Sequence, residues 1–144
     1  MRLLPILAAP IIAALALAAP ASAAAPIAGR WVTVEGDSVV TIGPCGGAGG
    51  AKTCGRITTF LKRPPTPNPV DSRNPDPGLR GRPIMGLAVL SGFSDAGKDW
   101  RGRIYDPRSG RSYKSILSRN ADGTLKVQGC VAFLCQTQVW RPAR

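Results

Sequence analysis

Short runs of β-branched and apolar residues recur about every ten residues along this chain, and they constrain its fold more than any other feature. Gly, Pro, Asn and Asp separate the runs, and helical periodicity is weak. Such spacing is typical of an antiparallel meander, barrel or sandwich. The runs that we expect to form strands are 29–34, 38–43, 55–61, 84–91, 100–105, 112–118, 124–130 and 136–141.

The residues between the runs predict tight hairpins. Segment 106–110 has a proline suited to start a turn and a glycine suited to a positive φ, and 120–123, with Asn, Asp and Gly, serves the same purpose. Eight antiparallel strands joined by such turns close most naturally into an up-and-down barrel. We therefore predict an all-β, eight-stranded barrel whose interior is either filled by side chains or shared with one small ligand.

One segment, 62–83, departs from this regular spacing of strand-like runs and tight turns. It spans 22 residues with seven prolines and has almost no apolar residue besides them. A connection of this length is too long for a plain hairpin loop. Because extended proline-rich chain costs little entropy to order, the segment could form a fixed lid or a partner-docking strap. The alternative is an inert, stiff surface excursion.

The first 23 residues have the pattern of a secretory signal peptide. Arg2 precedes an apolar stretch, and Ala21, Ser22 and Ala23 form a small-residue cleavage site. A retained membrane anchor is the alternative, but the stretch is Ala-rich and interrupted by prolines. We expect cleavage to leave residues 24–144 as one periplasmic or secreted domain without a membrane span.

The four cysteines fall into two local pairs, Cys45 with Cys54 and Cys130 with Cys135. Each pair flanks a turn-like segment, and an oxidising compartment favours two disulfides. A zinc site would also use four cysteines, but the chain lacks histidine and any Cys-x-x-Cys. We therefore predict two disulfides and neither a metal nor another cofactor.

The chain is strongly basic. Without Arg2, 18 basic residues face 8 acidic ones, a net charge of +10. This charge favours anionic partners, such as an anionic component of the cell envelope, although it could also serve solubility alone. The few aromatic residues provide no stacking platform, which argues against nucleic acid as a partner.

The sequence contains no recognisable catalytic set. It has no histidine to act as a base and no Gly-x-Ser-x-Gly elbow, and its cysteines are expected to be oxidised. Its acidic residues fall in predicted turns or at strand ends. We therefore predict that the protein is not an enzyme.

Both ends of the predicted domain carry a short motif that resembles the signature of lipocalin-like calycin barrels. Gly29 and Trp31 open the first run, and Arg141 closes the last. The resemblance implies that Arg141 lies across Trp31 and closes the barrel, with a cation–π energy of roughly 0.5 to 2 kcal/mol.

Several longer blocks resemble a family of secreted bacterial proteins known as domain of unknown function 2147. The resemblance covers essentially all of the chain after the signal peptide and implies a lipocalin-like barrel of the cell envelope. The blocks are 44–46 with 54–57, 74–77 through 79–83, 102–107 with Gly110 and Tyr113, and 136–141.

Two functions remain open. In one, the barrel binds a small apolar or amphipathic ligand, with an interior lined by Ile84, Met85, Leu87, Val89, Tyr113, Leu125 and Val127. In the other, the interior is filled and the basic surface docks an anionic polymer or a protein. Arg80 and Arg82 could hold an anion, because guanidinium groups bind carboxylate and phosphate bidentately.

Overall fold

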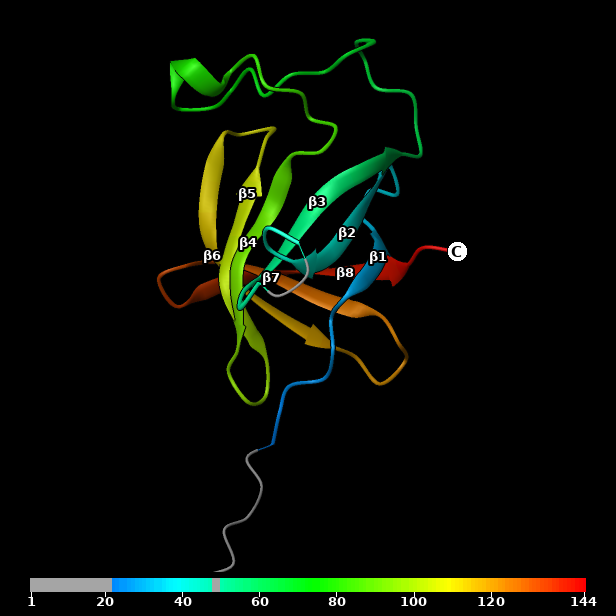
Figure 1. The fold of residues 1–144 in the computed structure, drawn as a ribbon, viewed down its shortest axis with the longest axis vertical. Coiled ribbons are helices and arrows are strands. Elements are labelled where there is room, and N and C mark those ends of the chain that lie inside the picture. Colours follow the sequence, from blue (N-terminus) through cyan, green and yellow to red (C-terminus); the bar gives the residue numbers. More distant parts are fainter. Residues whose placement is uncertain (1–21, 48–49) are drawn as a thin grey trace, which may run out of the picture.

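The computed structural model describes residues 22–47 and 50–144, so most of the expected signal peptide lies outside the described residues. Eight antiparallel strands follow one another around a closed barrel (Figure 1). The predicted all-β, up-and-down barrel is confirmed. Its strands are β1 (Gly29–Val32), β2 (Ser38–Pro44), β3 (Thr53–Phe60), β4 (Ala88–Asp95), β5 (Trp100–Asp106), β6 (Arg111–Arg119), β7 (Leu125–Val131) and β8 (Leu134–Pro142). Within the described part of the chain, no helix has the length and apolarity needed to cross a membrane.

The fourth strand differs most from the sequence prediction. It runs from Ala88 to Asp95, whereas the apolar run 84–91 had suggested an earlier start. The backbone N–H of Ile84 donates instead to the carbonyl of Pro69, and Gly86 adopts a φ of +84°. The first residues of the run are therefore held by the proline-rich segment and turn into the barrel wall only afterwards.

Large apolar side chains fill the barrel interior. Trp31, Leu90, Phe93, Leu117 and Leu125 are almost completely shielded from water and belong to one continuous core. Interiors of this kind are close-packed, and each fully buried side chain stabilises the fold by roughly 1.5 to 3 kcal/mol.

The segment before β1 is anchored to this core. Ile27 is buried in it, and the indole N–H of Trp31 donates to the Ile27 carbonyl at 2.9 Å. A second indole, that of Trp100, donates to the carbonyl of Ala25 at 2.9 Å. The two bonds hold residues 25–27, which precede β1, against the barrel.

Arg119, rather than the predicted Arg141, supplies the cation over Trp31. The Arg119 guanidinium carbon lies 4.6 Å from the centre of the indole ring. Arg141 follows the buried Trp140, and successive side chains of a strand point to opposite faces. Arg141 is therefore exposed on the outer wall, where it pairs in register with Val32.

Both predicted disulfides are present, Cys45 with Cys54 and Cys130 with Cys135. The second links opposed residues of β7 and β8, one residue pair before the turn that joins these strands. Among the described residues there is no free cysteine.

The β7–β8 hairpin extends beyond its neighbour on the closing side of the barrel. β1 pairs with β8 only at Trp31–Pro142 and Val32–Arg141, whereas β7 pairs with β8 from Leu134 to Trp140. All residues of β8 from 134 to 139 are exposed, whichever face they point to. In Figure 1 the turn between β7 and β8 projects past the side of β6.

Candidate functional site

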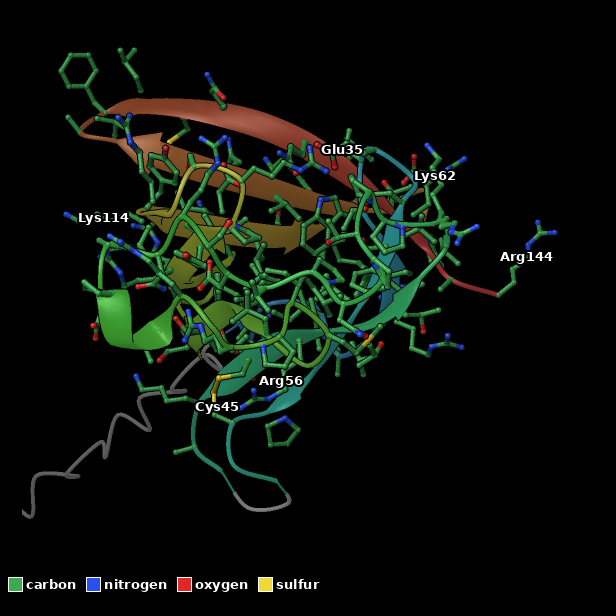
Figure 2. The ribbon with its side chains drawn as sticks, turned by 90° about the horizontal axis from the view of Figure 1, so that it is seen from above. Glu35, Cys45, Arg56, Lys62, Lys114 and Arg144 are labelled. Carbon is green, nitrogen blue, oxygen red and sulfur yellow. A yellow bond between two sulfur atoms is a disulfide. The ribbon has the colours of Figure 1, made fainter. Side chains whose placement is uncertain are left out.

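The proline-rich segment 62–83 crosses one end of the barrel, between the end of β3 and the start of β4 (Figures 1 and 2). Its second half forms a closed loop, because Val70 forms an isolated bridge with Pro83. A short 3₁₀ helix, η1 (Pro77–Leu79), lies at its far end, capped by the Asp76 carboxylate, which accepts from the Gly78 N–H. The segment is therefore a folded element of the protein.

A cavity of about 370 Å³ lies between this segment and the end of β3. Six of its seven lining residues are apolar, and Asn68 contributes the one polar side chain. The lining residues are Phe60, Pro67, Asn68, Pro69, Val70, Pro83 and Met85.

A buried carboxylate fastens the proline-rich segment to the barrel. Asp71 has no solvent-exposed surface, and it accepts a hydrogen bond from the Tyr105 hydroxyl at 2.5 Å and one from the Asn74 side-chain amide at 2.8 Å. Arg82 donates to it through Nε and Nη2, both at 2.9 Å. Since Tyr105 lies on β5 and the other three residues lie in the segment, this cluster sets the segment's position. We call these four residues the Asp71 latch.

The latch also fixes protonation states. Burial alone would raise the pKa of Asp71, but hydrogen bonds from Tyr105, Asn74 and Arg82, together with the charge of Arg82, outweigh it and lower this pKa. Burial and the neighbouring Asp71 raise the pKa of Tyr105. At neutral pH the latch thus contains an ionised carboxylate and a protonated phenol, which is the arrangement that its hydrogen bonds require.

The segment also comes very close to the β5–β6 turn. Gly110 has a φ of +69°, and a Cβ added there would lie 1.8 Å from the carbonyl oxygen of Arg73. Only glycine allows both this conformation and this approach.

An ion-pair bridge spans the same end of the barrel. Arg108, in the β5–β6 turn, contacts Glu35 at 3.1 Å and Asp37 at 2.9 Å in the β1–β2 turn. Burial would raise the pKa of Asp37, but hydrogen bonds from Thr33 and Ser38 and the charge of Arg108 lower it. The bridge is largely exposed, so its contribution to stability is small, about 0 to 1 kcal/mol.

A smaller cavity, of about 170 Å³, lies beside residues 26–28, which precede β1. Its lining residues are Pro26, Ile27, Ala28, Gly43, Pro44, Thr53 and Trp100. It is less than half the volume of the cavity beside the proline-rich segment, so the latter is the better candidate for a ligand.

Of the seven residues expected to line the interior, Met85 alone reaches either cavity. Leu87, Val89, Leu125 and Val127 are buried in the core. The other two, Ile84 and Tyr113, are only partly buried, and Ile84 packs against the core. The strands point these apolar side chains inward as expected, and four of them belong to the continuous core.

Arg80 and Arg82 have partners within the chain. Arg82 binds Asp71 and also lies 5.6 Å from the centre of the Tyr105 ring, while Arg80 donates from Nε to the carbonyl of Asn74 at 2.8 Å. Both arginines therefore help to hold the proline-rich segment in place, and their binding of an external anion stays a prediction.

Phe60, Val70 and the prolines of the cavity wall were not predicted as site residues. The prolines had left the segment open as a lid, a docking strap or an inert excursion, and no local pattern indicated which of them turn toward the barrel. Among the described residues, no three His, Cys, Asp or Glu side chains are arranged to hold a metal ion.

A bacterial protein family described as "uncharacterized protein conserved in bacteria (DUF2147)" matches residues 29–141. The chain belongs to the DUF2147 family. The matched region begins with β1 and ends in β8, so it includes the proline-rich segment as well as the barrel wall. None of the curated proteins matches this DUF2147 chain.

Among solved structures, this DUF2147 chain is similar to protein HP1028 from Helicobacter pylori, described as belonging to the lipocalin family. The similarity covers 83% of this chain and 84% of that one, with a TM-score of 0.69 and 20% sequence identity. At this identity the similarity concerns the fold. The predicted resemblance to a lipocalin-like barrel is thereby confirmed.

Proposed function

We propose that this DUF2147 protein binds a small apolar or amphipathic ligand in the cavity beneath the proline-rich segment, without catalysing a reaction on it. The observation that carries the proposal is the cavity wall, in which six of the seven lining residues are apolar and Asn68 offers one polar group. Ligand sites commonly combine apolar walls with a few polar groups that fix orientation.

The size and the construction of the cavity support the same function. A volume of about 370 Å³ falls at the lower end of the range for small-molecule sites, roughly 300 to 1,000 Å³. The latch and the Val70–Pro83 bridge hold its wall in position before any ligand arrives. A preformed wall reduces the entropy lost on binding.

We further propose that the protein acts in the periplasm or outside the cell, after removal of residues 1–23. Its two disulfides are compatible with an oxidising compartment. The description of the similar Helicobacter pylori protein as a lipocalin supports a binding role rather than an enzymatic one.

Native mass spectrometry tests the binding function. The protein is purified gently from its own cell envelope, and part of the sample is denatured to identify any small molecule that it carries. We expect a stoichiometric apolar adduct. A protein that shows only its own mass, even after incubation with an envelope lipid extract, would contradict the proposal.

Two matched variants locate the site. Met85→Arg introduces a charge into the cavity wall, whereas Leu79→Arg adds the same charge elsewhere on the segment, and the two positions are similarly exposed, at 44% and 40%. The adduct should disappear with Met85→Arg and persist with Leu79→Arg. Equal loss in both variants would place the ligand outside this cavity.

A further inference from the structure

The turn between β7 and β8 is the most exposed apolar feature among the described residues. Val131 is 64% exposed, Phe133 90% and Leu134 70%, and Ala132 lies between them. Contiguous apolar groups that remain in water mark an interaction site more often than isolated ones do. We call residues 131–134 the apolar tip.

The tip is held in shape despite its exposure. The Cys130–Cys135 disulfide closes it at its base, and Ala132 adopts a φ of +51°, in the left-handed region that Asn or Gly normally occupies in such a turn. The sequence thus places Ala and Phe in a turn where ordinary turn chemistry favours Asn, Asp or Gly. An unfavourable conformation at an exposed turn is grounds for a functional hypothesis.

Two cations face each other beside the tip. Arg103 on β5 and Lys114 on β6 are directly opposed in register, and Lys114 is in turn opposed to Cys130 at the base of the tip. Both side chains are exposed, and neither takes part in the ion pairs of the described residues. Like charges directly opposed on a sheet are destabilising. An anionic partner would relieve this repulsion. In Figure 2 the Lys114 side chain points outward on the same side of the molecule as the β7–β8 turn.

We propose that the apolar tip and the Arg103–Lys114 pair form a docking surface for an anionic lipid bilayer. Phe133 and Leu134 enter the boundary between headgroups and acyl chains, and the two cations contact lipid phosphates. The dimensions agree, because a strand rises about 3.3 Å per residue and Phe133 therefore lies within about 10 Å of the level of Lys114. Interfacial segments bury their apolar side chains about 5 to 10 Å deep.

Charge favours a bilayer over a second copy of the chain as the occupant. Residues 127–131 and 134–139 carry no charge, and the charged pair nearest to them is positive. A second copy meeting the tip would bring two such pairs together, whereas anionic headgroups neutralise them. The proposal does not depend on the cavity beneath the proline-rich segment, since no residue of the tip lines it.

Vesicle co-sedimentation tests the proposal. The purified protein is mixed with vesicles of phosphatidylglycerol and phosphatidylethanolamine, and separately with vesicles of phosphatidylcholine alone. We expect binding to the first and little to the second. Phe133→Ser should weaken binding by roughly tenfold, because the inserted aromatic surface is lost. A second variant, Phe133→Trp, should show a blue-shifted emission component with the anionic vesicles that the parent protein lacks.

Matched control variants distinguish insertion of the tip from a general loss of apolar surface or positive charge. Val34→Ser removes another exposed apolar side chain, 49% exposed, and should leave binding unchanged. Arg103→Gln with Lys114→Gln should weaken binding clearly more than Arg30→Gln with Arg141→Gln, which removes two exposed cations from β1 and β8.

Three results would overturn the proposal. One is the absence of binding to anionic vesicles. Another is binding that Phe133→Ser leaves intact, which would indicate charge attraction alone. The third is a change of oligomeric state in Phe133→Ser, measured by light scattering, without a change in vesicle binding, which would assign the tip to a contact between copies of the chain.

Discussion

The backbone nitrogen of Ala24 lies 3.1 Å from each carboxylate oxygen of Asp95. Ala24 is the residue that becomes the N-terminus if the signal peptide is removed after Ala23. Cleavage would then convert a neutral amide donor into an ammonium group facing a carboxylate. Before cleavage only the acceptor is charged, whereas afterwards both groups are, and the attraction between opposite charges strengthens the contact.

We therefore predict that Asp95→Asn destabilises the cleaved protein by about 1 to 2 kcal/mol and the uncleaved protein by less. Asparagine can still accept the hydrogen bond that Asp95 receives from the Gly97 N–H, so the turn is preserved. Urea unfolding of both forms measures the difference. Asp122→Asn is the control, because Asp122 also accepts from a nearby backbone N–H, that of Thr124, at 2.9 Å. Equal losses in the two forms would contradict the prediction.

The Asp71 latch should make stability depend on pH in the acid range. Because the folded pKa of Asp71 lies below its ordinary value of 3.8, the latch contributes stability above that value and loses it as pH falls through the folded pKa. Asp71→Asn should cost about 3 kcal/mol near neutral pH, since it breaks a buried charge pair. The difference in the free energy of unfolding between Asp71→Asn and the parent protein should become smaller below about pH 4.

Thermal unfolding at a series of pH values checks this prediction. Asp76→Asn, at the exposed cap of η1 in the same segment, should change stability by less than about 1 kcal/mol. A constant gap between Asp71→Asn and the parent across the acid range would show that the carboxylate charge is unimportant to the latch.

The cation over Trp31 gives a direct comparison of two arginines. Arg119→Gln should destabilise the protein by about 0.5 to 2 kcal/mol, because the guanidinium at 4.6 Å is lost from the indole face. Arg141→Gln, at an exposed position on the outer wall, should cost less than about 0.5 kcal/mol. Chemical denaturation of both variants decides the matter, and the reverse order would restore Arg141 as the partner of Trp31.

Substitution of two glycines with positive φ distinguishes the effect of backbone strain from that of a steric clash. Gly110→Ala should free the proline-rich segment, because the added Cβ meets the Arg73 carbonyl, and limited proteolysis should then cut the segment faster. Gly123, with a φ of +84°, has nothing within 4 Å of an added Cβ. Gly123→Ala should therefore lower stability by roughly 1 kcal/mol without exposing the segment. Equal proteolysis of the two variants would argue against the close contact.

Local chemistry was enough to predict much of the fold. The spacing of β-rich runs and turns predicted eight strands, and the short separation within each cysteine pair predicted the disulfides. Both signals come from residues close together in the sequence. The start of the fourth strand was predicted less accurately, because a distant segment determines it. The N–H of Ile84 donates to the carbonyl of Pro69 and not to a neighbouring strand.

The candidate site was harder to predict for the same reason. Alternation correctly indicates that Leu125 and Val127 point inward, but it gives no information on whether facing strands leave a space between them. The cavity depends on how segment 62–83 returns to the barrel, which is set by contacts such as that between Asp71 and Tyr105, 34 residues apart. Likewise, Arg119 reaches Trp31 only because the barrel closes.

The joint between β1 and β8 consists of two residue pairs, and it unites the first strand of the chain with the last. Ribosomal synthesis proceeds from the N-terminus, so β1 cannot pair with β8 until Arg141 and Pro142 have been added. During that interval the growing sheet has two unpaired edges, which other chains could join. Completion of the ring, and protection from such pairing, therefore depends on Arg141 and Pro142.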